Sequence, residues 1–104
     1  MNIELLYFDG CPSHVQAEDI LRQALEETHS QAEIEKIDIT DEQMAIDLRF
    51  LGSPSIRING IDVDPVARDS TSFSRKCRIY QTDEGIRGWP SKKMVTETIH
   101  EAQK

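Results

Sequence analysis

The residues best suited to chemistry lie in the stretch Asp9-Gly10-Cys11-Pro12-Ser13-His14. A short apolar run, Ile3 to Phe8, precedes this stretch, and a segment with helical spacing, Val15 to Thr28, follows it. Cys11 is therefore predicted to lie where a strand ends and a helix begins. The first amides of a helix have no intrahelical partner and carry partial positive charge, so a thiolate there is stabilised and its pKa falls. Cys11 is a candidate nucleophile, and Pro12 suits a first helical turn.

His14 is a candidate partner of this thiol. It lies about one helical turn from Cys11, near enough to form a hydrogen bond or to carry a proton. As imidazolium His14 would favour the thiolate, whereas the carboxylate of Asp9 would oppose it. A solvated histidine in the first helical turn is an equally good interpretation of the same position.

Composition limits the classes of function. The chain has 104 residues with 19 acidic and 12 basic side chains, a formal net charge of −7, which argues against nucleic acid or an anionic membrane as a partner. No apolar run approaches the ~20 residues that span a bilayer, and the first eight residues lack the positive start of a signal peptide. We therefore expect one domain over residues 1–104 and a cytoplasmic location. Thiols are kept reduced there, so the two cysteines are expected to be reactive or inert rather than a permanent bridge.

The rest of the chain alternates strand and helix signals. Ile3 to Phe8 is nearly all apolar, as in a central strand covered on both faces. Further signals are an edge strand at Ile34 to Ile39, a capping pattern at Thr40-Asp41-Glu42-Gln43 that opens a helix from Asp41 to Leu51, a stop at Gly52, and a last helix capped by Ser91. Residues 64–88 are polar and irregular, apart from the short alternating piece Cys77-Arg78-Ile79-Tyr80.

A hairpin with a definite register is predicted around Asn59-Gly60, the favoured two-residue turn. Counting outward pairs Ile58 with Ile61, Arg57 with Asp62, and Ile56 with Val63. The two apolar pairs then share one face of the hairpin and the opposite charges meet on the other. The predicted order is β-α-β-α-β-β-α, which gives an α/β fold with a four-stranded mixed sheet flanked by helices, and an irregular insertion before the last helix.

This order, together with Cys-Pro at a helix start and Ser53-Pro54 before a hairpin strand, resembles the thioredoxin fold. The opening Leu-Leu-Tyr-Phe-Asp-Gly-Cys-Pro, the Gly52-Ser53-Pro54-Ser55 turn and the Cys77–Tyr80 piece resemble small thioredoxin-like proteins, some of them labelled alkylmercury lyase-like. The resemblance implies that the Ser53–Pro54 peptide bond is cis and lies beside Cys11. It also implies that the backbone near Ser53 and Pro54, together with Pro12, holds an extended substrate chain beside the sulfur.

The chain departs from the dithiol members of that family at one position. They carry a second cysteine three residues after the first, where this chain has His14. In the implied fold, the segment after Val63 starts at the end of the sheet that carries Cys11, so Cys77 could cross the site and resolve a mixed disulfide or sulfenic acid. Its neighbours Arg75, Lys76 and Arg78 would help to ionise it. The alternative is a half-buried cysteine that serves as a small apolar side chain.

Three functions follow as expectations. The first is a thiol redox protein that exchanges disulfides through Cys11, resolved by Cys77 or an external thiol, with a protein or small molecule as partner. The second is the handling of a soft metal or organomercurial by both thiolates, with Asp9 or His14 as proton donor. The third is a non-catalytic thioredoxin-like binding module. Neither cysteine belongs to a Cys-x-x-Cys zinc pattern, so no structural metal and no cofactor are expected.

Overall fold

The computed structural model describes residues 1–103 and has a mixed α/β architecture. Its elements are β1 (Ile3–Tyr7), α1 (His14–Glu27), β2 (Ile34–Asp38), α2 (Glu42–Asp47), β3 (Ser55–Ile58), β4 (Ile61–Asp62), the 3-10 turn η1 (Pro65–Ala67), β5 (Tyr80–Thr82), β6 (Gly85–Arg87) and α3 (Lys92–Ala102). The four-stranded sheet has the order β2-β1-β3-β4. The sheet is mixed, because β1 pairs with β2 in parallel and with β3 antiparallel.

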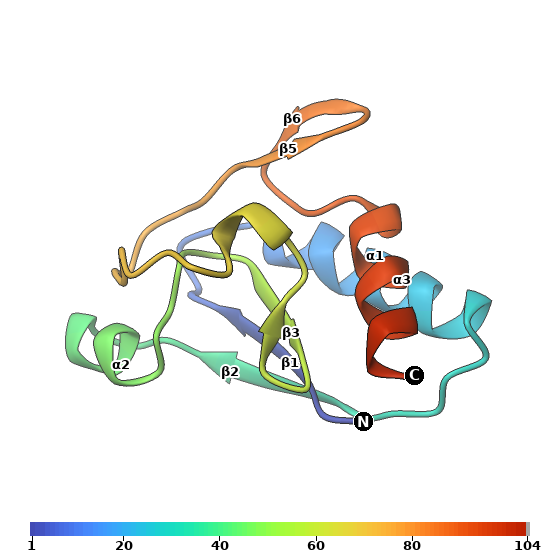
Figure 1. The fold of residues 1–104 in the computed structure, drawn as a ribbon. Helices are drawn as coiled ribbons and strands as arrows, with labels where there is room; N and C mark the ends of the chain where they lie inside the picture. Colours follow the sequence, from blue (N-terminus) through green and yellow to red (C-terminus); the bar gives the residue numbers. More distant parts are fainter. Residues whose placement is uncertain (104) are drawn as a thin grey trace.

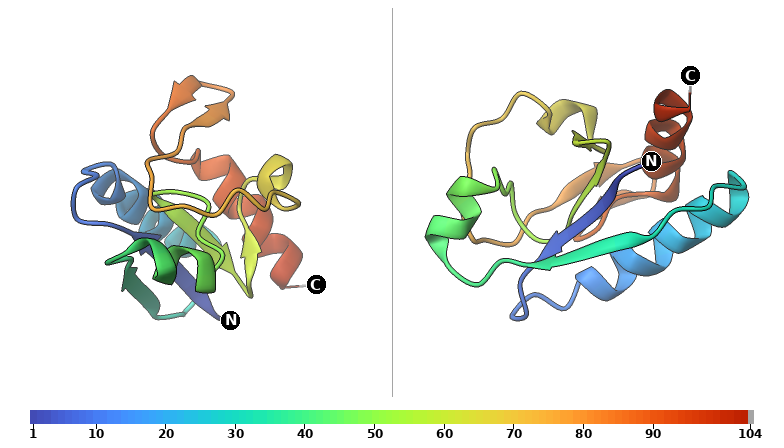
Figure 2. Two further views of the ribbon diagram at one scale, coloured as in Figure 1. Left: turned by 90° about the vertical axis from the view of Figure 1, so that its left-hand side faces the viewer. Right: turned by 90° about the horizontal axis from the view of Figure 1, so that it is seen from below.

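Strand β1 occupies the middle of the sheet because apolar side chains lie on both of its faces. Leu5 faces a core shared with α1 and α3, whereas Leu6 faces a second core built around α2 and Phe50. Figures 1 and 2 show α1 and α3 side by side, with α2 across the sheet from them. The two-sided apolar run thus has the central position predicted from sequence, and β2 lies at the edge as expected.

The β3–β4 hairpin has the predicted register. Ile58 pairs with Ile61 and Arg57 with Asp62, and the Val63 amide donates to the Ile56 carbonyl at 3.1 Å. The predicted contact of opposite charges is wrong in one respect. Both Asp62 oxygens accept hydrogen bonds from Arg78, so the carboxylate pairs with a distant arginine rather than with its cross-strand neighbour.

Helix α2 differs from the prediction at both ends. Asp41, not Thr40, is the N-cap, because its carboxylate accepts the Met44 amide at 2.8 Å. The helix ends at Asp47 rather than Leu51, and Arg49 then takes a left-handed conformation with φ 57°. Gly52 therefore does not end the helix. Gly52 instead allows the close approach of Arg78, the residue that follows Cys77.

The region predicted as irregular contains an additional hairpin. β5 pairs with β6 antiparallel, and this two-stranded piece stands away from the main sheet (Figure 1). It is anchored at its base by Tyr80, which is completely buried and donates its hydroxyl to the Pro54 carbonyl. In residues 1–103 we find no helix that is both long and apolar enough to cross a membrane.

The cap of α2 provides a test of local stability. We expect Asp41→Ala to lower the free energy of unfolding by about 1 kcal/mol, because the Met44 amide loses its acceptor. Thr40→Ala is the matched control and should change it by much less, since its hydroxyl contacts only the Met44 sulfur, at 3.7 Å. Urea unfolding of both variants measures the difference. A larger loss in Thr40→Ala would restore the cap predicted from sequence.

Candidate functional site

Cys11 lies in the connection between β1 and α1, as the sequence predicts. The Cys11 amide donates to the Phe8 carbonyl at 3.1 Å, which turns the chain after the strand. Helix α1 begins at His14 with Ser13 as its N-cap, and the Ser13 side chain makes no capping hydrogen bond. The Ser13 hydroxyl is thus left to face the cysteine. Cys11 is only 3 % exposed, so its thiol interacts mainly with protein groups.

The surroundings of Cys11 favour its thiolate. Burial by itself raises the pKa of the Cys11 thiol, but hydrogen bonds from the Cys77 thiol, the Ser13 backbone, and the Ser53 and Ser13 hydroxyls outweigh it and lower the pKa. In its protonated form the thiol donates to the Ser53 carbonyl, with the sulfur 3.6 Å from the oxygen. The site therefore accommodates both protonation states of one sulfur.

Cys77 reaches Cys11 through backbone pairing with Ser53. The Ser53 amide donates to the Lys76 carbonyl at 2.7 Å, and the Arg78 amide donates to the Ser53 carbonyl at 3.1 Å. These two bonds form a parallel bridge between Ser53 and Cys77. The bridge brings together two cysteines that are far apart in sequence, and both are free thiols in this structure.

The two thiols titrate as a pair with opposite shifts. A hydrogen bond to Cys11, then burial, and then the charge of Cys11 raise the pKa of the Cys77 thiol. Cys77 is exposed, whereas Cys11 is buried. The first proton is thus lost from Cys11, and Cys77 stays protonated as the donor that stabilises the Cys11 thiolate.

The positive charges beside Cys77 do not ionise it, contrary to the prediction. The Arg78 guanidinium binds Asp62, with its Nη1 atom 2.9 Å from a carboxylate oxygen. The Arg75 guanidinium lies 4.7 Å from the Phe8 ring centroid, and the Lys76 ammonium donates to the Ser72 hydroxyl. All three cations are engaged elsewhere, and the thiol nearest to Cys77 dominates its pKa. Cys77 is also exposed rather than the half-buried apolar residue of the alternative interpretation.

Two features hold the Cys77 segment against the sheet. Gly52 has φ 124°, and a Cβ atom there would lie 2.8 Å from the Arg78 Cβ, so only glycine allows this close approach. Arg78 binds Asp62 and the Ser55 hydroxyl, and its guanidinium lies 4.2 Å from the Tyr80 ring centroid. The residue next to Cys77 is therefore fixed by a buried ion pair.

The position of His14 does not support the role predicted for it. Its ring packs on Tyr7, with 4.5 Å between centroids, and its Nδ1 atom is buried without a hydrogen-bond partner in residues 1–103. The groups that shift the pKa of Cys11 most do not include His14 or Asp9. A proton-transfer role for His14 stays a prediction that no contact supports here.

The predicted substrate-binding residues divide into two kinds. Pro12 is exposed beside Cys11. Ser53 and Pro54 are buried, and the peptide bond between them is cis, as predicted. The backbone amide and carbonyl of Ser53 both pair with the chain's own Lys76–Arg78 segment. An extended substrate cannot pair with Ser53 while that segment is in place.

Several residues of the site were missed in the sequence. Ser13 supplies both a backbone and a hydroxyl hydrogen bond to Cys11, and its place directly before the helix was the available signal. Gly88 packs so closely on Ser13 that a Cβ atom would lie 2.8 Å from the Ser13 hydroxyl oxygen. Asp62 holds Arg78, the residue after Cys77, in place. No local sequence pattern indicates this contact, since 16 positions separate the two residues.

Among residues 1–103, no group of three or more His, Cys, Asp or Glu side chains is arranged to hold a metal ion. Any soft cation at this site would have the two thiolates as its protein ligands. Comparisons with protein-family models, with curated proteins and with solved structures find no match for this chain. A function for this chain is therefore inferred from the geometry of the two thiols.

The close approach at Gly52 predicts a specific effect of substitution. Gly52→Ala should displace Arg78, lower the free energy of unfolding and raise the pKa of Cys11, because Cys77 moves away with Arg78. Gly60→Ala is the matched control: Gly60 also has a positive φ, 80°, but nothing lies within 4 Å of an added Cβ. The control should cost only the backbone strain, roughly 1 kcal/mol, and leave the pKa of Cys11 unchanged. Equal thiol titrations in the two variants would contradict this account.

The opposite pKa shifts predict the pH dependence of alkylation. Because the folded-state pKa of Cys11 is lowered, its reaction with iodoacetamide should reach half its maximal rate at a lower pH than that of an ordinary thiol. Cys77→Ala should move that midpoint upward, since the donor to the thiolate is lost. Conversely, Cys11→Ala should lower the midpoint of Cys77. Mass spectrometry of labelled peptides measures both, and an unmoved Cys11 midpoint in Cys77→Ala would contradict the coupling.

Proposed function

We propose that this protein is a thiol-based redox protein that carries out thiol–disulfide exchange through Cys11, with Cys77 as the resolving thiol. The observation that carries the proposal is the contact between a buried thiol of lowered pKa and a second, exposed thiol held against it by the Ser53 bridge. The juxtaposition of Cys11 with the cis Ser53–Pro54 bond adds to the resemblance to the thioredoxin fold.

The reaction proceeds in two exchanges. The Cys11 thiolate attacks one sulfur of a substrate disulfide, forms a mixed disulfide with it, and the other substrate sulfur leaves as a thiolate that takes up a proton. Cys77 then loses its proton and attacks the Cys11 sulfur, which releases the second substrate thiol. The substrate disulfide is reduced to two thiols, and the two protein thiols are oxidised to one disulfide. An external dithiol then reduces the Cys11–Cys77 disulfide back to two thiols by the same exchange chemistry.

The occupied backbone of Ser53 favours small substrates. Both hydrogen-bonding groups of Ser53 are used by Lys76 and Arg78, which leaves no pairing there for an extended polypeptide. A small-molecule disulfide needs no such pairing. We therefore propose small-molecule disulfides ahead of protein disulfides as substrates. In either case the partner that restores the thiols is a cytoplasmic reductant.

The same pair of thiols also suits a second function, the capture of a soft cation such as Hg²⁺ or Cu⁺. Thiolates are the ligands that soft metals prefer, and two of them meet here. Organomercurial cleavage would in addition need a proton donor, and neither Asp9 nor His14 is among the main groups that shift the pKa of Cys11. The redox function is favoured because the opposite pKa shifts assign one step to each thiol: the Cys11 thiolate attacks first, and Cys77 resolves the mixed disulfide afterwards.

Reaction with a small disulfide tests the redox proposal. Incubated with oxidised glutathione, the wild-type protein should form an internal Cys11–Cys77 disulfide and lose two hydrogens in mass. Cys77→Ser should instead accumulate a mixed disulfide on Cys11, because no second thiol is present to resolve it. Intact-mass and peptide mass spectrometry distinguish these products.

Other outcomes point to the remaining functions. Tight binding of one Hg²⁺ that requires both thiols, without any internal disulfide, would favour metal capture. A Cys11 that stays reduced and unalkylated near neutral pH would contradict both thiol functions and favour a non-catalytic binding module. Cys11→Ser is the control in each assay and should form no internal disulfide.

A further inference from the structure

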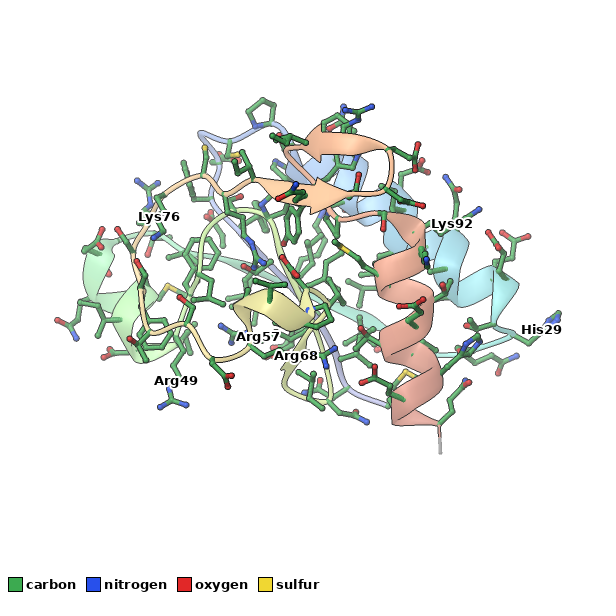
Figure 3. All side chains as sticks on the ribbon, turned by 45° about the horizontal axis from the view of Figure 1, so that its top comes forward. His29, Arg49, Arg57, Arg68, Lys76 and Lys92 are labelled. Carbon is green, nitrogen blue, oxygen red and sulfur yellow. The ribbon has the colours of Figure 1, made fainter. Side chains whose placement is uncertain are left out.

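A cavity of about 370 Å³ lies outside the thiol site, between the sheet and the segment after η1. Arg57 projects into it from β3, and Arg49 and Arg68 come from the loop after α2 and from the end of η1. Figure 3 labels these three arginines. They converge on one cavity although the chain as a whole has a net charge of −7. Positive charge is thus concentrated at one place in an acidic protein.

Arg57 and Arg49 lack a carboxylate partner. Among residues 1–103, no acidic side chain lies within 4.0 Å of either guanidinium. Arg57 donates one hydrogen bond, to the Arg49 backbone carbonyl, and Arg49 lies over the Phe73 ring at 5.8 Å from its centroid. A guanidinium has five N–H donors, so most of those on Arg57 have no protein acceptor.

Arg57 is partly withdrawn from water, although its unpaired nitrogens still reach solvent. Loss of water around its guanidinium lowers the pKa of Arg57, and the charges of Glu4 and Asp62 do not offset the effect. An arginine stays protonated at any physiological pH, so the charge persists in a partly dry place. An anion in the cavity would replace water as the acceptor of these donors and would neutralise the charge.

Asp62 does not serve as that acceptor, and Arg68 adds little unpaired positive charge. Asp62 lines the cavity, but its carboxylate is bound by Arg78 at 2.9 and 3.2 Å and accepts the Asp64 amide. Arg68 is itself partly satisfied, since its Nε atom donates to the Asp62 carbonyl and its Nη1 atom lies 3.5 Å from Glu101. The positive charge available to a ligand thus comes mainly from Arg57 and Arg49.

The other lining residues are Leu51, Ile61 and Phe73, which are apolar, together with Gly60 and Ser70. A ligand in the cavity would therefore meet hydrocarbon beside the cations. The volume is near the lower end of the range for small-molecule sites. We propose that this cavity binds a small organic anion, with its carboxylate or phosphate group on Arg57 and Arg49 and its apolar part against Leu51, Ile61 and Phe73.

Titration with phenyl phosphate, followed by amide chemical shifts in NMR, tests this proposal, with inorganic phosphate and phenol as ligand controls. Phenyl phosphate should give saturable shifts around the cavity and bind more tightly than either control. Arg57→Gln should weaken binding by about tenfold or more, because charge-assisted hydrogen bonds are lost. Arg87→Gln removes the same charge from the exposed β6 strand and should leave the affinity unchanged.

Three outcomes would overturn the proposal. These are shifts that do not saturate, shifts that map away from the cavity, and equal weakening in Arg57→Gln and Arg87→Gln, which would mean binding to diffuse charge only. If Arg57→Gln does not fold, Arg49→Gln takes its place, because Arg49 is exposed and its removal disturbs little packing. Unchanged affinity in Arg49→Gln would then contradict the site. None of these outcomes depends on the thiols, so they are independent of the redox proposal.

Discussion

The Ser53 peptide is the constraint on which the thiol site depends. Its carbonyl oxygen accepts the Arg78 amide and faces the Cys11 sulfur, and its amide binds the Lys76 carbonyl. The Ser53 hydroxyl accepts the Phe8 amide, which ties the same residue to the end of β1. One residue therefore fixes both cysteine-bearing segments relative to each other. Neither Cys11 nor Cys77 lies in a helix or a strand of its own, so their contact relies on this shared partner.

The buried pair of Arg78 and Asp62 maintains the arrangement at a distance from the sulfurs. Their side chains are 8 % and 6 % exposed, and removal of one member of such a pair costs about 3–5 kcal/mol because the other charge is left unpaired. The pair is geometrically well supported, with two guanidinium–carboxylate contacts and an additional bond to Ser55. The ion pair mainly fixes the position of Cys77, because Arg78 directly follows it.

Sequence patterns predicted the parts of the fold that local chemistry determines. The apolar run of β1, the Asn59-Gly60 turn and the Ser91 cap each contain their own signal, and the structure has all three as expected. The early end of α2 was not predictable in this way, because the helical pattern continues to Leu51 while Arg49 adopts a positive φ. The placement of Cys77 beside Cys11 was expected from the implied fold and not from any local pattern, because it depends on contacts between distant residues. The predicted help of Arg75, Lys76 and Arg78 in ionising Cys77 is wrong in direction for a related reason: these cations are neighbours in sequence but bind other groups, and the contact with Cys11 raises the pKa of Cys77.

Asp62 connects the two regions of the molecule that we consider functional. Its carboxylate binds Arg78, beside Cys77, and its backbone carbonyl accepts the Arg68 side chain, at the wall of the arginine-lined cavity. The segment from η1 to β5 crosses one face of the sheet and contributes to both places. This face has its own apolar core around Leu6 and Phe50, and beside that core it is closed by polar contacts and by the close approach at Gly52. The opposite face, where α1 and α3 pack on Leu5 and Ile56, has a continuous apolar core. Both faces of the sheet therefore carry an apolar core, and the face toward η1 differs in that it also holds the buried charges of Arg78 and Asp62.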